Sequence, residues 1–312
     1  MSPVPVTVVT GFLGAGKTTL VNHWLSQTTR GDIAVVVNEL GAVGIDGELL
    51  AERAQTLVEI AGGCVCCTTQ AELVEALGRL ATSASPPQRI LIETSGAASP
   101  AGVLRAVAAQ EDAWRLDGIV TVVAASRAQT LTDHDLAIEQ VGYADIVVMS
   151  WADQCDEMQR TAAEAAVATH NGAAVSVTSD RGHIAAAPTL DALLALRRAD
   201  FAPPRTLAPR HSVYDSISLV LEGALDGERF ADFMELQLGR YAGRLFRIKG
   251  ILAVNGLAER MIVQGVADLV EVTFGEPWAE TQPSSRLVIV GYGLDRAELT
   301  DAFAACAEAA VR

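Results

Sequence analysis

Eight residues near the start of the chain constrain its fold more than any other segment. The run from Gly11 to Thr18, GFLGAGKT, fits the pattern GxxxxGK[ST], directly follows a β-branched run and precedes a helical segment. Glycines allow the backbone to curl, so that its N–H groups and the N-terminus of the next helix can face phosphate oxygens. The segment predicts a phosphate-binding loop in a nucleotide-binding α/β fold, with a chance glycine turn as the alternative.

Two side chains of this phosphate loop have predicted roles. We expect Lys17 to reach the β and γ oxygens of a nucleoside triphosphate and Thr18 to ligate Mg²⁺. The chain has only two lysines, Lys17 and Lys249, so a lysine retained at this position supports a functional role. The other nucleotide contacts in the loop are expected from Gly11, Gly14, Ala15, Gly16 and Thr19.

Acidic residues that follow two further strand-like runs complete the expected catalytic set. The run Ile90 to Ile92 leads to Glu93, and Gly96 comes three residues later. We expect Glu93 to hold Mg²⁺ through water and the Gly96 amide to sense the γ-phosphate. Glu39, after an earlier run, could supply a carboxylate to a transition metal or to the catalytic water. The candidate catalytic residues are Lys17, Glu39, Glu93 and Gly96.

Short β-rich runs alternate with segments of helical length through the first part of the chain. Such alternation is typical of βαβ units, in which helices cover both faces of a mainly parallel sheet. The predicted strands are Val6–Thr10, Ile33–Val37, Arg89–Ile92, Ile119–Val123, Ile146–Met149 and Ala173–Val177, and the predicted helices include Thr18–Gln27, Gln70–Leu80 and Asp156–Thr169. The expected fold class is α/β, a P-loop NTPase domain.

A proline-containing stretch then separates two kinds of pattern. Residues 197–210 include Pro203, Pro204 and Pro209, which is typical of a linker. Strand-like runs predominate after it, at Val213–Leu221, Leu245–Val254, Arg260–Gln264, Val270–Phe274 and Leu287–Val290, with helices near Glu228–Leu238 and Arg296–Ala309. We expect a nucleotide-binding domain over residues 1–196, a linker over 197–210 and a smaller α+β domain over 211–312.

Three of the five cysteines form the cluster Cys64-Val65-Cys66-Cys67. Sequence neighbours pair poorly into a disulfide framework, and a turn close to a helix N-terminus favours the thiolate form. A C-x-C pair can point two sulfurs at one ion, and thiolates suit Zn²⁺, Cu⁺ and similarly soft metals. We expect Cys64, Cys66 and Cys67 to bind such a metal, with Glu39 as a further ligand. A buried cysteine cluster and a redox switch are the alternatives.

Composition excludes several classes of partner. The formal net charge is -15 and no basic run occurs, which argues against nucleic acid. No apolar run approaches the roughly 18 residues that a membrane-spanning helix needs. The first residues lack the charged and apolar regions of a signal peptide, so we expect a cytoplasmic protein.

These motifs together closely resemble the CobW-type metal-chaperone GTPases, which include cobalamin-biosynthesis W proteins, nitrile hydratase activators and zinc-responsive metalloprotein activators. The resembling segments are Gly11–Thr19, Asn38–Gly41 with Gly44–Gly47, Gly62–Cys67, Glu93–Pro100, Arg247–Gly250 and Arg286–Gly291. The resemblance implies that GTP hydrolysis controls delivery of a metal, with zinc as the first candidate, to a client metalloprotein. It implies that the C-terminal domain contacts the client. The oligomeric state is open between a monomer and a nucleotide-dependent homodimer.

The segment after the strand ending at Met149 departs from the family pattern. The family's guanine-reading Asn-Lys-x-Asp is replaced by Ser150-Trp151-Ala152-Asp153. We expect Asp153 to accept hydrogen bonds from guanine and Trp151 to stack on the base. Stacking tolerates any base, so the preference for GTP over ATP should be weaker than the family pattern implies. Ala42 also replaces a frequent family glutamate, and the family's histidine-rich stretch is absent.

Two other functions share the phosphate loop. A small-molecule kinase, or another ATP-using NTPase with structural or redox cysteines, is the alternative function. A metal-dependent scaffold that no longer hydrolyses nucleotide is a third. Release of phosphate without an acceptor separates the leading hypothesis from both.

Overall fold

The computed structural model describes residues 3–27, 33–39, 56–61, 68–83, 85–110, 112–179, 189–198, 214–266, 269–278 and 283–307. Backbone contacts divide the chain into two compact units. The first comprises residues 1–167 and 174–199, and the second comprises residues 168–173 and 200–312. Apart from its first two residues, the expected linker over 197–210 lies outside the described residues.

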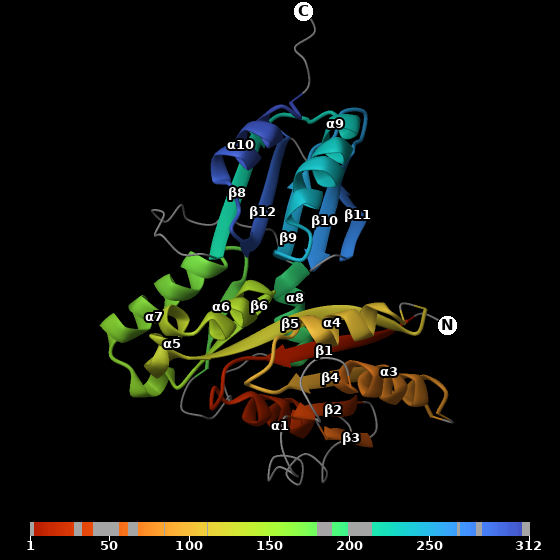
Figure 1. Ribbon diagram of the computed structural model, residues 1–312, viewed down its shortest axis with the longest axis vertical. Helices are drawn as coiled ribbons and strands as arrows, with labels where there is room; N and C mark the ends of the chain where they lie inside the picture. Colours follow the sequence, from red (N-terminus) through yellow and green to blue (C-terminus); the bar gives the residue numbers. More distant parts are fainter. Residues whose placement is uncertain are drawn as a thin grey trace, which may run out of the picture. The chain divides into compact units, whose positions relative to one another are not determined.

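The first unit is built on a seven-stranded parallel sheet with the strand order β3-β2-β4-β1-β5-β6-β7 (Figure 1). Its strands are β1 (Val4–Thr10), β2 (Ile33–Glu39), β3 (Thr56–Ala61), β4 (Arg89–Thr94), β5 (Trp114–Ala124), β6 (Ile146–Ser150) and β7 (Val175–Thr178). Sequence reasoning did not find β3. It is an edge strand in which Glu59 interrupts a short apolar run.

Helices cover both faces of this sheet. They are α1 (Lys17–Gln27), α3 (Thr68–Ala81), α4 (Ala101–Ala108), α5 (Thr130–Asp133), α6 (Asp135–Gly142), α7 (Glu157–His170) and α8 (Leu190–Arg198), with the short turns η1 (Ala125–Arg127) and η2 (Ala152–Gln154). In β6, Ile146 and Val148 join the cluster that includes α1 and α8, whereas Val147 and Met149 join the one that includes α6 and α7. Because successive side chains point to opposite faces, a doubly covered strand needs a continuous apolar run. The α/β prediction is confirmed.

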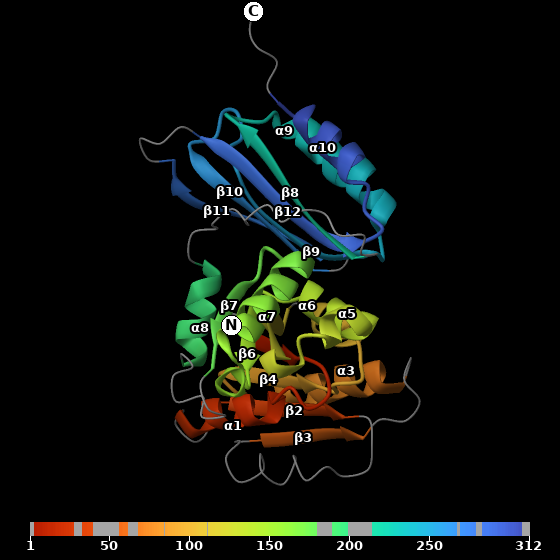
Figure 2. The ribbon, with the colours of Figure 1, turned by 90° about the vertical axis from the view of Figure 1, so that its left-hand side faces the viewer.

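The second unit has a five-stranded antiparallel sheet with the order β11-β10-β9-β12-β8. Its elements are β8 (Tyr214–Glu222), α9 (Gly227–Asp232), the π-helical turn η4 (Phe233–Gln237), η5 (Leu238–Tyr241), β9 (Leu245–Leu252), β10 (Glu259–Val266), β11 (Leu269–Pro277), β12 (Ser284–Tyr292) and α10 (Arg296–Ala304). Figure 2 shows α9 and α10 on one face of the sheet, where they enclose an apolar core. The predicted last helix is shorter in the structure, since α10 ends at Ala304.

Side-chain caps define where the two helices of this unit begin. Asp226 accepts hydrogen bonds from the backbone N–H groups of Glu228 and Arg229, and Asp295 accepts one from Glu298. These bonds satisfy donors that the first turn of a helix leaves unpaired. Within the described ranges, no helix is both long enough and apolar enough to cross a membrane.

Candidate nucleotide site

The phosphate loop joins the central strand β1 to helix α1. Gly11, Gly14 and Gly16 have φ angles of 140°, 70° and 100°, in the region that disfavours residues with a Cβ atom. A Cβ atom at Gly11 would lie 2.2 Å from the carbonyl oxygen of Val122 on the neighbouring strand β5. Glycine is therefore required here by both backbone conformation and close packing.

Lys17 begins α1 and directs its ammonium group back into the loop. Its Nζ donates to the carbonyl oxygen of Gly11 at 2.9 Å and approaches that of Phe12 at 3.4 Å. The side chain is buried although it is charged. A cation shielded from solvent interacts more strongly with an anion, so this placement suits a phosphate group.

The next residue of α1 contacts the end of β4. Thr18 Oγ1 donates to Glu93 Oε1 at 2.6 Å, and Glu93 is 6% exposed. The parallel pairing of Val9 with Glu93 places this carboxylate beside the phosphate loop. Hydroxyl and carboxylate oxygens are the hard ligands that Mg²⁺ prefers. The two residues that the sequence assigned to magnesium therefore lie together, and their donor set fits the ion.

Gly96 lies against the phosphate loop in the turn after β4. A Cβ atom at Gly96 would lie 2.8 Å from the backbone nitrogen of Leu13 and 2.9 Å from Lys17 Nζ. Gln140 of α6 holds the same turn, because its Nε2 donates to the carbonyl oxygen of Ala98 at 3.0 Å. Only a residue without a side chain permits this approach.

A cavity of ≈ 400 Å³ opens between the phosphate loop and the turn after β4. Pockets for small molecules commonly have volumes of about 300–1,000 Å³. The lining residues are Leu13, Gly14, Gly16, Lys17, Thr18, Thr19, Val37, Glu93, Thr94, Ser95, Gly96, Ala97 and Trp151. The predicted nucleotide contacts line this cavity, except for Gly11, Ala15 and Asp153.

The segment from Ser150 to Asp153 reaches this cavity through Trp151. Trp151 is 39% exposed and has a φ angle of 56°, an uncommon conformation for a bulky residue. Asp153 is exposed on η2. Ser150 Oγ donates to the carbonyl oxygen of Ala15 at 2.6 Å, which fastens the start of this segment to the phosphate loop. Sequence reasoning missed this contact, because a serine at the end of a strand does not indicate its tertiary partner.

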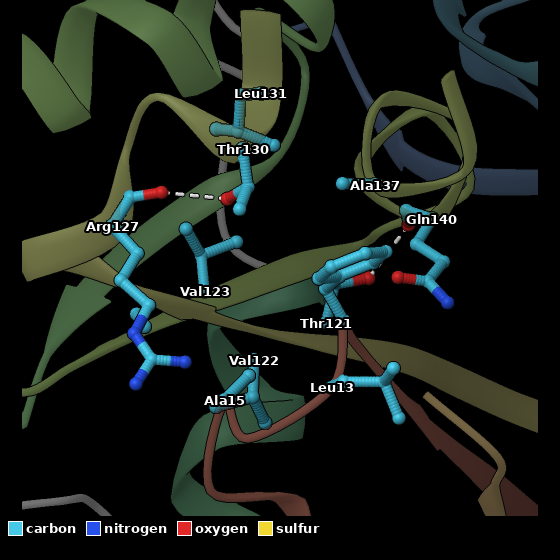
Figure 3. Close-up of a pocket in the computed structure, with 12 residues that line it drawn as sticks. Leu13, Ala15, Thr121, Val122, Val123, Arg127, Thr130, Leu131, Ala137 and Gln140 are labelled. Carbon is cyan, nitrogen blue, oxygen red and sulfur yellow. Dashed lines mark hydrogen bonds between the residues drawn. The ribbon is translucent and has the colours of Figure 1, made fainter. Parts of the chain in front are cut away.

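A second, much smaller cavity lies beside the phosphate loop, between β5 and α6 (Figure 3). Its volume is ≈ 20 Å³, which is room for about one water molecule. Thr121 Oγ1 donates to the backbone carbonyl oxygen of Gln140 at 2.8 Å at its edge. This space is too small for a nucleotide or a metabolite, so the larger cavity is the candidate site.

The predicted transition-metal ligands lie in parts of the chain whose side chains the structure does not describe. Cys64, Cys66 and Cys67 lie outside the described residues, as does the side chain of Glu39. The backbone of β2 pairs Glu39 with Ala61 of β3, three residues before Cys64. Among the residues that the structure describes, no group of three or more His, Cys, Asp or Glu could hold a metal.

The chain matches two family descriptions. "CobW/HypB/UreG, nucleotide-binding domain" matches residues 5–177, and "Cobalamin synthesis protein cobW C-terminal domain" matches residues 214–307. The sequence is 30% identical to the zinc chaperone YjiA of Escherichia coli (strain K12), over 97% of this chain and 99% of that protein. It is 34% identical to the zinc chaperone CobW of Pseudomonas aeruginosa PAO1, over 96% of this chain and 91% of that protein.

Solved structures agree with these matches. The crystal structure of Zn(II)-bound YjiA GTPase from E. coli is 26% identical, with a TM-score of 0.75 over 99% of this chain and 100% of that one. A triple mutant of YjiA, in which one glutamate and two cysteines are replaced by alanine, is also described as Zn(II)-bound; it matches with a TM-score of 0.74, 27% identity and the same coverage of both chains.

Proposed function

The chain belongs to the CobW/HypB/UreG family of nucleotide-binding proteins, and from this premise we propose that it is a GTP-hydrolysing metallochaperone. The proposed cargo is a soft transition metal, zinc in the first place, which the protein carries to a client metalloprotein. The observation that carries the proposal is the phosphate end of the large cavity. There a buried lysine and a hydroxyl–carboxylate pair face one space of ≈ 400 Å³.

Each group at this end has a role in hydrolysis that follows from its position. Lys17 binds the β- and γ-phosphate oxygens, and the backbone N–H groups of the curled loop hold the phosphates in place. Thr18 and Glu93 would hold Mg²⁺, Glu93 through water. When bound, the ion neutralises charge that develops on the phosphate oxygens. The Gly96 amide lies close enough to the loop to respond to the γ-phosphate.

The order of the strands supports coupling between the metal motif and hydrolysis. In the sheet, β3, β2, β4 and β1 are consecutive neighbours, and parallel strands end at the same edge. The cysteine motif follows β3, Glu39 ends β2, and Glu93 lies near the end of β4. Ligands that follow strands adjacent to the hydrolytic centre would shift when the γ-phosphate leaves. We therefore propose Cys64, Cys66, Cys67 and Glu39 as the ligands of the carried metal.

The base end of the cavity is proposed to discriminate weakly between purines. Trp151 lines the cavity and offers a ring face to any base, whereas the nearby Asp153 supplies the guanine-specific carboxylate. We expect GTP to be preferred over ATP by less than about a hundredfold. A larger preference would contradict this part of the proposal.

Names of relatives support zinc as the cargo, since two of them are named zinc chaperones. A zinc-bound triple mutant of YjiA lacks two cysteines, so total zinc binding is a poor test for the motif in this chain. The sharper measurement is zinc affinity by competition with a chelating dye, in GDP and in a non-hydrolysable GTP analogue. Equal affinity in the two nucleotide states would reject the coupling.

The first experiment measures phosphate release from GTP and from ATP, with and without Zn²⁺. It compares the wild type with Cys66→Ala and with Cys306→Ala, a cysteine in the second unit that serves as the matched control. We expect release in the absence of any acceptor, a modest preference for GTP, and a zinc response that Cys66→Ala abolishes and Cys306→Ala retains. If the rate of phosphate release depends neither on zinc nor on Cys66, the cysteines have a structural or redox role. That result would favour a kinase-like reaction with an acceptor.

A further inference from the structure

A strongly acidic chain that binds a polyanion needs positive charge at the binding site. The formal net charge is -15, and a nucleoside triphosphate is itself highly negative. Among the described residues that line the large cavity, the cation is Lys17. A second source of positive charge is therefore to be sought beside the cavity.

Arg127 lines the small cavity on the other side of the phosphate loop residues, and it is not among the lining residues of the large one. It ends η1, directly after β5, and its carbonyl oxygen accepts a hydrogen bond of 2.6 Å from Thr130 Oγ1, which fixes the backbone of this turn. A Cβ atom built on Gly14 would lie 3.4 Å from Arg127 Nη1, so the guanidinium group lies against the phosphate loop. Figure 3 shows the side chain extending from its turn toward the part of the loop that carries Ala15. Gly14 itself lines the large cavity.

The guanidinium group of Arg127 is not engaged elsewhere in the described part of the chain. It makes no ion pair and no side-chain hydrogen bond there, and the residue is exposed. Arg89 of the same unit differs, because it bridges Asp117 at 2.8 Å and Asp191 at 3.1 Å. An exposed arginine next to a phosphate loop, with none of the described carboxylates paired with it, is available to an anionic ligand.

We propose that Arg127 is a second nucleotide-binding cation, which contacts the phosphate groups along Gly14. The proposal rests on the proposed nucleotide-binding function and adds a residue to the same site. Guanidinium groups match phosphate oxygens with two parallel N–H donors, which suits this position. A cation that contacts the phosphates equally before and during hydrolysis adds uniform binding energy, so we expect removal of Arg127 to weaken affinity and to leave the maximal rate nearly unchanged.

The test measures the affinity of GTP, GDP and guanosine for the wild type, Arg127→Gln and Arg127→Lys by calorimetry. Arg105→Gln, an exposed arginine on α4 that lines neither of the two cavities beside the phosphate loop, is the control. We expect Arg127→Gln to weaken GTP and GDP binding by about fivefold to fiftyfold, with no change for guanosine. Arg127→Lys should restore part of the affinity, because it keeps the charge and loses the second parallel donor. The salt dependence of GTP binding should also become shallower in Arg127→Gln, because one charged contact is lost.

Lys17→Ala, measured in parallel, separates failure of this inference from failure of the proposed function. If Lys17→Ala abolishes GTP binding and Arg127→Gln binds as tightly as the wild type, Arg127 is a surface residue and the inference is rejected. An equal loss for guanosine would also reject it, because the effect would then not lie in phosphate contacts. If Lys17→Ala itself binds GTP normally, the large cavity is not the nucleotide site, and both proposals fail.

Discussion

The two ends of the large cavity are built differently. At the phosphate end, Lys17 and Glu93 are buried, and both are held by hydrogen bonds that connect β1, α1 and β4. At the base end, Trp151 and Asp153 are exposed, and the fixed contact is that of Ser150 with the loop. The groups that would contact phosphate are therefore held inside the fold, whereas those that would contact the base lie at its surface. Four predictions test this difference.

Removing the buried cation should have the largest effect. Lys17→Ala takes away the ammonium group that the phosphate oxygens would contact, and we expect kcat/KM for GTP to fall by about a hundredfold or more. Phosphate release measured at saturating and limiting GTP checks this. Arg160→Gln, an exposed position on α7, is the control and should behave as the wild type. A loss of less than about fivefold would remove the contrast between the two ends.

A methyl group at Gly96 should have the next largest effect. The added Cβ atom would lie 2.8 Å from the backbone of Leu13, which cannot move without displacing the phosphate loop. Since a displacement of about 1 Å can cost a hundredfold in rate, we expect kcat of Gly96→Ala to fall by roughly tenfold to a hundredfold. Gly102→Ala on α4 is the matched control, because nothing lies within 4 Å of its Cβ position. Equal rates for the two variants would show that the close approach of Gly96 is unimportant.

Removing the ring at the base end should weaken binding without changing selectivity. Trp151→Asn introduces a residue type that tolerates the left-handed conformation of this position, so the turn should persist. From the usual contribution of base stacking, about 1–3 kcal/mol, we expect GTP and ATP affinities to fall by a common factor of about five to a hundred. Met158→Ala, an exposed apolar position on α7, controls for surface effects. A change in the ratio of the two affinities would mean that Trp151 reads the base.

The smallest expected effect concerns α1, the helix that begins with Lys17. Burial lowers the pKa of His23 from its usual value of 6.5, and the side-chain amide of Gln27 lies 3.0 Å from its Nε2 atom, which can accept a hydrogen bond while neutral. The unfolded chain therefore binds this proton more readily, so stability should decrease as the pH falls through about 6.5.

Because His23 is only partly buried, the effect on the melting temperature should be about 1 °C. His23→Gln should flatten the melting temperature between about pH 7.5 and 5.5 relative to the wild type. A steeper pH dependence in this variant would show that other titrating groups control the stability of the phosphate end.

Much of the phosphate end was readable from the sequence. The glycine spacing, Lys17 and Thr18 are local in the chain, and their chemistry requires those residue types at that spacing. The sequence predicted that Thr18 and Glu93 both serve a magnesium ion, but it did not predict a bond between them. Their direct hydrogen bond of 2.6 Å depends on the register of β1 with β4. The edge strand β3 escaped prediction, because an edge position relaxes the apolar pattern that identifies a buried strand.

The sequence by itself determined the fold class, the phosphate loop and the residue types of the candidate metal motif, because periodicity and motif spacing are properties of neighbouring residues. Only the tertiary structure decided that Ser150 holds the loop, that Gly96 closes against Leu13, and that the Arg127 side chain lies beside Gly14. These contacts join residues that are 83 to 135 positions apart in the chain. They arise from the order in which the strands pair, β4 and β5 on either side of β1, which no local pattern encodes.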